Sequence, residues 1–122
     1  NQQILDKADI ILIERQPPGG LTSIESVLLY VFRHKTKLVS PNSMHKHFRI
    51  GHLDYEHRKI KTEEITTPYL SAFDGFSNQV RKHDMAYAMC LILFYFSKDK
   101  ETYLRKCRRK IDDGLFEQFR CK

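Results

Sequence analysis

The chain has 122 residues, of which 41% are hydrophobic and 30% are charged, and its formal net charge is +6. These values are typical of one globular domain with a real core and no low-complexity tract. The longest apolar stretch, 85–96, is too short to span a bilayer, and no segment has the pattern of a signal peptide. We therefore expect no membrane partner.

The three cysteines are Cys90, Cys107 and Cys121, and no two of them form a Cys-x-x-Cys pair. Cys90 lies inside the apolar stretch, where a small core residue is the simplest interpretation. This odd, dispersed set favours a reducing, intracellular compartment over secretion. A disulfide bond between Cys107 and Cys121 is the alternative.

The N-terminal part of the chain delivers a carboxylate to the end of an apolar run. Residues 1–7 are typical of a helix end or a linker, and the aliphatic run 10–13 predicts a strand buried on both faces. Glu14 would then emerge at the carboxyl edge of a sheet, where α/β proteins place their chemistry. The Pro-Pro-Gly-Gly sequence at 17–20 predicts a turn. An ordinary solvated charge is the alternative interpretation of Glu14.

The next segment has the pattern of a helix that faces the core. Thr22 and Glu25 have the spacing of a capping box. The apolar residues that follow recur at helical spacing and would pack on the sheet: Ile24, Val27, Leu28, Val31 and Phe32. A second strand, 37–40, is expected before Pro41, and one helical turn within 42–48.

A further helix is predicted from Asp54 toward Pro68, with Ile60 and Leu70 pointing inward. On this helix Arg58 and Lys61 would be neighbours that straddle a phosphate, because they are three residues apart, whereas Lys59 would point aside. A solvated basic face is the alternative.

Five of the six histidines lie between His34 and His57. A zinc site is conceivable from four of them: His45, His47, His52 and His57. No cysteine stands near, and the spacing fits no structural zinc pattern well. Phosphate contacts or plain surface histidines are the other interpretations.

Asp84 is predicted to open a helix that is apolar nearly all round through Phe94. A carboxylate there can cap the free helix amides, and metal ligation is the alternative. The last segment, 97–122, carries nine Lys or Arg residues against five Asp or Glu residues, a difference of +4. Such a cluster favours a phosphate backbone as partner, with an anionic protein or a solvated tail as alternatives.

Four short blocks, taken in order, resemble one family. They are Ile-Glu-Arg-Gln-Pro at 13–17, Lys-Leu-Val-Ser-Pro at 37–41, Asp-Tyr-Glu-His-Arg-Lys at 54–59 and Arg-Lys-His-Asp-Met-Ala-Tyr-Ala at 81–88. Together they are similar to the RuvC-like Holliday junction resolvases of the RNase H-like superfamily, above all to the mitochondrial, poxvirus and other large DNA virus members.

The resemblance implies an α/β fold of the RNase H-like type, a mixed sheet flanked by helices. The first strands would be absent from this chain, so that 1–122 would be one domain, incomplete at its N-terminus, with a basic C-terminal segment. A protein partner that completes the sheet is an alternative.

The implied activity is metal-dependent cutting of four-way DNA junctions by a homodimer, at a viral replication site, in the nucleus or in the mitochondrion. Glu14 and Asp84 would hold Mg²⁺ or Mn²⁺, and Lys61 or Lys59 would steady the scissile phosphate. The residues expected to bind nucleic acid are Arg15, Arg58, Arg81, Lys82, Arg105, Arg108 and Arg109.

Two departures from the family pattern concern the metal site. The family's first-strand Asp has no counterpart before Glu14, and Tyr87 stands where the closing helix has its second Asp. Two-metal hydrolysis needs several carboxylates around ions about 3.5–4 Å apart. The alternative function is therefore that of a catalytically degenerate member that binds nucleic acid or protein as a structural or regulatory subunit.

Overall fold

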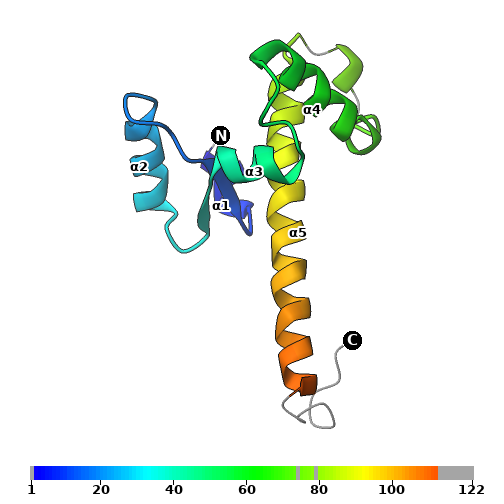
Figure 1. Ribbon diagram of the computed structural model, residues 1–122. Coiled ribbons are helices and arrows are strands. Elements are labelled where there is room, and N and C mark those ends of the chain that lie inside the picture. Colours follow the sequence, from blue (N-terminus) through cyan, green and yellow to red (C-terminus); the bar gives the residue numbers. More distant parts are fainter. Residues whose placement is uncertain (1, 74, 79, 113–122) are drawn as a thin grey trace.

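A computed structural model describes residues 2–73, 75–78 and 80–112; between 101 and 112 the described side chains are those of Thr102 and Arg105. The chain is a mixed α/β arrangement (Figure 1). Its elements in order are α1 (Gln2–Lys7), β1 (Ile11–Glu14), α2 (Thr22–Val31), β2 (Thr36–Val39), α3 (Pro41–His47), α4 (Tyr55–Leu70), a 3-10 turn η1 (Phe76–Asn78) and α5 (Lys82–Asp112).

The two strands pair in parallel, with Ile11 opposite Thr36 and Glu14 opposite Val39. Helix α2 makes the crossover between them, as a parallel pair requires. Both carboxyl ends therefore meet at one edge, where the Arg15 amide donates to the Val39 carbonyl at 2.9 Å. The prediction of a strand buried on both faces was wrong, because Ile11 alone is buried in β1 and the other three residues are half-buried. A sheet of only two strands is too small for helices to bury both of its faces.

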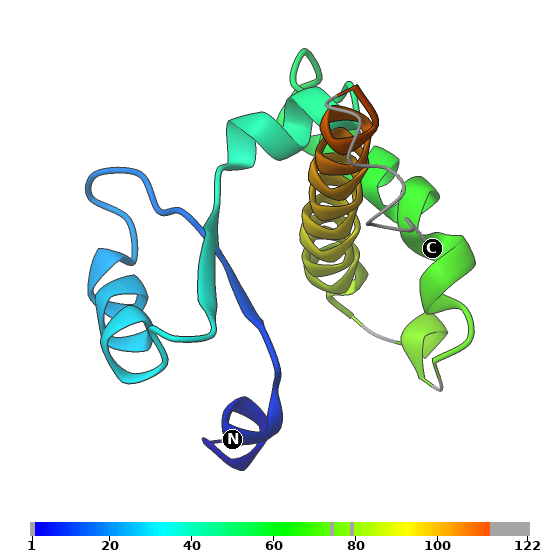
Figure 2. The ribbon, with the colours of Figure 1, turned by 90° about the horizontal axis from the view of Figure 1, so that it is seen from below.

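Helix α2 forms where it was predicted, but its apolar side is not covered. Ile24, Val27 and Val31 are more than half exposed, and Phe32, just after the helix, is the buried member of the set. Figure 2 shows α2 on the opposite side of the strands from α5. The expectation that this helix faces the core is therefore wrong for the described part of the chain.

The predicted capping box is also wrong. The N-cap residue is Leu21, and no side chain caps the helix. The Glu25 carboxylate instead accepts a hydrogen bond of 2.7 Å from the Gln16 amide, in the loop that follows β1. Glu25 thus ties α2 to the strand that carries Glu14.

Side-chain oxygens begin the next two helices. The Ser40 hydroxyl accepts from the Ser43 amide at the start of α3, where Pro41 suits the first helical turn. The Asp54 carboxylate caps α4 by accepting from the His57 amide at 2.9 Å. Both helices follow directly from local sequence chemistry.

The buried side of α4 differs from the prediction. Leu70 is buried as expected, but Ile60 is exposed and the inner face carries Thr62 and Thr66. Thr62 donates its hydroxyl proton to the Lys59 carbonyl and Thr66 donates to the Thr62 carbonyl. Because these hydroxyls are satisfied within the helix, threonines can face the interior at little cost.

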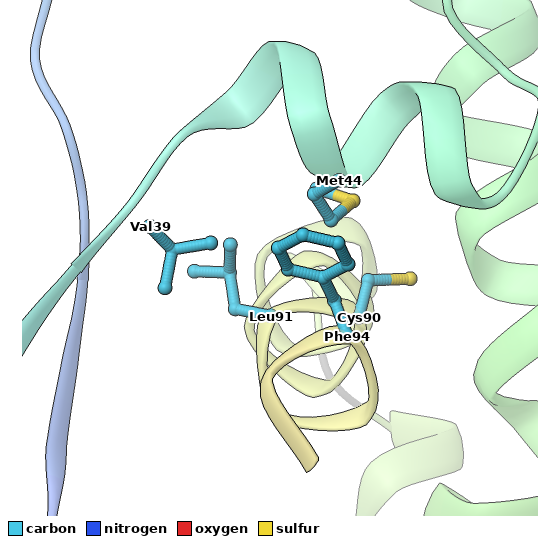
Figure 3. Close-up of a cluster of buried hydrophobic side chains, with 5 residues drawn as sticks. All are labelled: Val39, Met44, Cys90, Leu91 and Phe94. Carbon is cyan, nitrogen blue, oxygen red and sulfur yellow. The ribbon is translucent and has the colours of Figure 1, made fainter. Parts of the chain in front are cut away.

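Helix α5 supplies most of the core. Leu91 and Phe94 lie against Val39 of β2 and Met44 of α3, and Cys90 belongs to the same buried cluster (Figure 3). Cys90 is fully buried, as predicted, and burial raises the pKa of its thiol to about 11. A second cluster joins Leu70, Phe76 and Ala86.

Helix α5 is not buried all round, since the apolar residues Met85, Ile92 and Phe96 are exposed. It begins at Lys82, two residues before Asp84, and its C-terminal half extends away from the other elements (Figure 1). Among the described residues, no helix has the length and apolar character needed to cross a bilayer.

Candidate functional site

Glu14 lies in a hydrogen-bonded row with two side chains from distant elements. The Tyr87 hydroxyl of α5 donates to Glu14 Oε1 at 3.3 Å, and His45 Nε2 of α3 lies 2.9 Å from the same hydroxyl. Because the phenol gives its one proton to Glu14, His45 donates Nε2–H to the phenol oxygen. The row therefore holds a carboxylate in a defined orientation at the carboxyl edge of the sheet.

The groups in this row have perturbed acidities. Burial raises the pKa of the Glu14 carboxyl group, and the hydrogen bond from Tyr87 opposes that rise in part. Burial lowers the pKa of His45, and the Arg58 charge lowers it further. The pKa of the Tyr87 phenol is raised by burial and by the Glu14 charge. Opposite shifts of neighbouring groups in a cavity are typical of functional sites.

A cavity of about 360 Å³ adjoins this row. It brings together Glu14 of β1, Arg58 and Lys59 of α4, and Asp84 of α5. The remaining lining residues are His45, Tyr55, Thr62, His83 and Tyr87. Four elements therefore converge on one space that holds two carboxylates and two permanent cations.

Arg58 is a partly buried cation of this cavity. One of its terminal nitrogens donates to the Leu53 carbonyl at 2.8 Å. Its Nε is buried and has no hydrogen-bond partner among the described residues. A buried donor without a partner costs stability.

Asp84 does not cap α5, because the helix begins two residues earlier. Its carboxylate instead lies 2.6 Å from Arg81 Nε and 3.1 Å from His83 Nε2, and it is about half exposed. Asp84 lines the cavity. Arg81 is not among its lining residues and forms an ion pair with the Asp84 carboxylate.

The two lysines of α4 exchange the places that the sequence suggested. Lys59 lines the cavity, with its ammonium 4.5 Å from the centre of the Tyr55 ring and 3.3 Å from Glu56 Oε1. Lys61 is paired with Glu64 at 2.7 Å on the exposed side and does not line the cavity. The expectation that Arg58 and Lys61 share one site while Lys59 points aside is therefore wrong, because Lys59 and not Lys61 lines the cavity with Arg58.

The other predicted nucleic-acid contacts lie in several places. Arg15 lines a second cavity beside the first, and Lys82 lines a separate hollow with Glu63 and Thr67. Arg105 is exposed on α5. The side chains of Arg108 and Arg109, like those of Cys107 and Cys121, lie outside the described residues.

The described residues contain no group of three or more His, Cys, Asp or Glu side chains positioned to hold a metal ion. The four-histidine zinc site is therefore not assembled: His57 pairs with Asp54, and His47 packs on Phe48 and Phe94. Glu14 and Asp84 are the two carboxylates that line this cavity, and their oxygens are of the kind that Mg²⁺ and Mn²⁺ prefer as ligands. They do not fit a two-ion site.

Sequence reasoning missed two cations that line a second cavity with Glu14, namely Lys46 and Arg49. A signal was present, because α3 follows β2 at the same sheet edge where β1 delivers Glu14. A short helix in that position must direct some of its side chains toward the carboxylate.

Comparison with known protein families, with curated proteins and with solved structures finds no match.

Proposed function

We propose that this chain is part of a metal-dependent, structure-selective DNA endonuclease of the RuvC-like, RNase H-like type, which resolves four-way junctions. One observation carries the proposal: Glu14, the pair Arg58 and Lys59, and Asp84 line one cavity. These residues belong to three separate blocks of the family resemblance, and a chance resemblance gives no reason for them to meet.

The cavity suits a phosphodiester group beside a metal ion. Glu14 and Asp84 would hold one Mg²⁺ or Mn²⁺, which supplies charge neutralisation and an activated water when bound. Arg58 and Lys59 would bind the phosphate, since both are cations that line the cavity. Tyr87 and His45 would orient the Glu14 carboxylate. A further carboxylate, needed for two ions, would come from outside the described residues.

The small sheet is compatible with this proposal. Parallel β1 and β2 with the α2 crossover form a unit that recurs in α/β sheets, and two strands alone are marginal. In an RNase H-like domain further strands would extend this sheet. A homodimer would make the two symmetric cuts that a four-way junction presents.

The test is an assay that scores binding and cutting of labelled four-way junctions and linear duplexes, with magnesium, manganese or EDTA. Glu14→Gln and Asp84→Asn are each expected to lower cutting by at least about 100-fold and to leave junction affinity within a few-fold, because a lost ligand costs no less than a lost supporting contact. Glu64→Gln, an exposed acid on α4, is the matched control. Unchanged cutting in Glu14→Gln would refute the assigned role.

Tyr87 favours a second function, junction binding without cutting. The phenol occupies the place of the family's last acid and is a poor magnesium ligand at neutral pH. If this function is correct, the wild-type chain binds junctions without cutting in either metal. Tyr87→Asp would then add a carboxylate beside Glu14 and introduce metal-dependent cutting that Tyr87→Asn does not.

A further inference from the structure

A second, larger cavity of about 810 Å³ adjoins the first and shares Glu14, His45 and Arg58 with it. Three segments wall most of this space: the loop after β1, helix α3 with the residue before it, and the turn between α3 and α4. We call it the basic groove. Its other lining residues are Arg15, Gln16, Pro17, Pro18, Ser40, Pro41, Asn42, Lys46, Arg49, Gly51 and His52.

The charge of the basic groove is strongly one-sided. Arg15, Lys46, Arg49 and Arg58 are permanent cations, and Glu14 is the single carboxylate among the described lining residues. Like charges held around one concavity repel each other and raise the local concentration of anions. The groove therefore suits a ligand with several negative charges.

Arg49 occupies a backbone conformation that costs stability. Its φ is 57°, the left-handed region that favours glycine. The position ends α3, where the Ile50 amide donates to the His45 carbonyl at 2.9 Å and Ile50 is 1% exposed. Helices commonly end in this way with glycine at the left-handed position. Arg49 lines the groove from this strained position, so its charge contributes to the groove despite the cost in stability.

Arg58 links the two cavities. It is a lining residue of both, so its charge acts on both spaces. Among the described residues that line the basic groove, the histidines carry the only aromatic rings, so these residues offer bases no large stacking surface. The recognition chemistry is thus that of phosphates and not of bases.

We propose that the basic groove holds the phosphate backbone of one nucleic-acid strand and leads it to Glu14. Arg15, Lys46 and Arg49 contact successive phosphates, and Arg58 takes the phosphate at the junction of the two cavities. This inference rests on the proposed function and extends it, because it assigns the strand's path on the side of Glu14 away from Asp84. Binding there is independent of sequence.

The test measures the affinity of labelled four-way junctions and single strands in EDTA, by fluorescence anisotropy between about 50 and 200 mM salt. The double variant Lys46→Gln, Arg49→Gln is expected to bind about tenfold or more weakly, with the slope of log affinity against log salt reduced by about one for each cation. Arg33→Gln, Lys37→Gln is the matched control. It removes the same two charges from exposed positions at the opposite end of the strands.

Arg49→Gly separates binding from folding. Glycine relieves the left-handed strain, so this variant is expected to melt at the same temperature as the wild-type chain or higher. Its affinity for nucleic acid should fall by the same factor as that of the single variant Arg49→Gln, because both variants remove the Arg49 charge. A Tm that holds while affinity falls supports the proposal. Unchanged affinity in both Arg49 variants overturns it.

The outcomes separate this inference from the proposed function. If the wild-type chain cuts junctions and the groove variants bind and cut normally, the endonuclease stands and the groove proposal fails. If the chain binds through the groove without cutting in any metal, the groove proposal stands and the endonuclease fails. If the chain binds no nucleic acid, both fail.

Discussion

Glu14 is half-buried, and its raised pKa is a statement about stability as well as chemistry. The folded state holds the proton more tightly than the unfolded chain, whose Glu has a pKa near 4.5. Below about pH 4.5, Glu14 therefore contributes favourably to the free energy of unfolding. This contribution is lost as the pH rises through the raised pKa of the folded state. At neutral pH the ionised Glu14 destabilises the fold.

Glu14→Gln should consequently raise the free energy of unfolding at about pH 7 and leave it little changed at about pH 4. Gln retains an oxygen that accepts from Tyr87, so the row of hydrogen bonds survives. Urea denaturation at the two pH values measures the difference, with Glu64→Gln as the exposed control. A variant less stable than wild type at neutral pH would contradict the role of burial.

From the sequence, the residues of the site could be predicted where they belong to a short motif or a strand end, but the contacts between distant residues could not. Glu14 at a strand end, and Asp84 with Arg58 and Lys59 from the family resemblance, do line one cavity. The partner of Glu14 could not be foreseen, because the hydrogen bonds from Tyr87 to Glu14 and from His45 to Tyr87 join residues 73 and 42 positions apart. The preference for Lys59 over Lys61 likewise depends on how α4 rotates against α5.

Among the elements, helix α2 shows that the spacing of apolar residues can predict a helix without predicting which residues are buried. The spacing of Ile24, Val27 and Val31 predicted a helix correctly, but spacing alone does not say what covers an apolar face. The same limit applies to α4, whose threonines satisfy their hydroxyls internally and so can lie inside while Ile60 lies outside. Helix starts were predictable where the cap is local, as at Asp54, and failed where Glu25 was recruited by Gln16.

The exposure of α2 has a direct test. Val27→Asp should change the free energy of unfolding by no more than about 0.5 kcal/mol, because the side chain is already 59% exposed. Leu91→Ala, in the cluster around Met44, should cost about 2–5 kcal/mol. Urea denaturation of the purified chain compares the two. A cost for Val27→Asp similar to that for Leu91→Ala would mean that the α2 face is covered in solution.

At the scale of the whole molecule, the core is unevenly distributed. The main cluster connects β2, α3 and the first half of α5 (Figure 3), and the second joins the end of α4 to η1 and α5. Helix α2 contains no buried residue and lies beyond the strands (Figure 2). Segments with few buried contacts open with a lower free energy than the core. The carboxyl edge that carries Glu14 thus lies between a stable half and a weakly held helix.

Native-state hydrogen exchange should resolve these two halves. The amides of α5 between Ala86 and Phe94 are expected to exchange at least about 100-fold more slowly than those of α2, because opening α2 exposes little apolar surface. Added four-way junction in EDTA should slow exchange in the turn 48–53, which walls the basic groove, and should leave the middle of α2 unchanged. Equal protection in α2 and α5 would show that the apolar face of α2 is covered. Slowing confined to α2 would move the nucleic-acid contact away from Glu14.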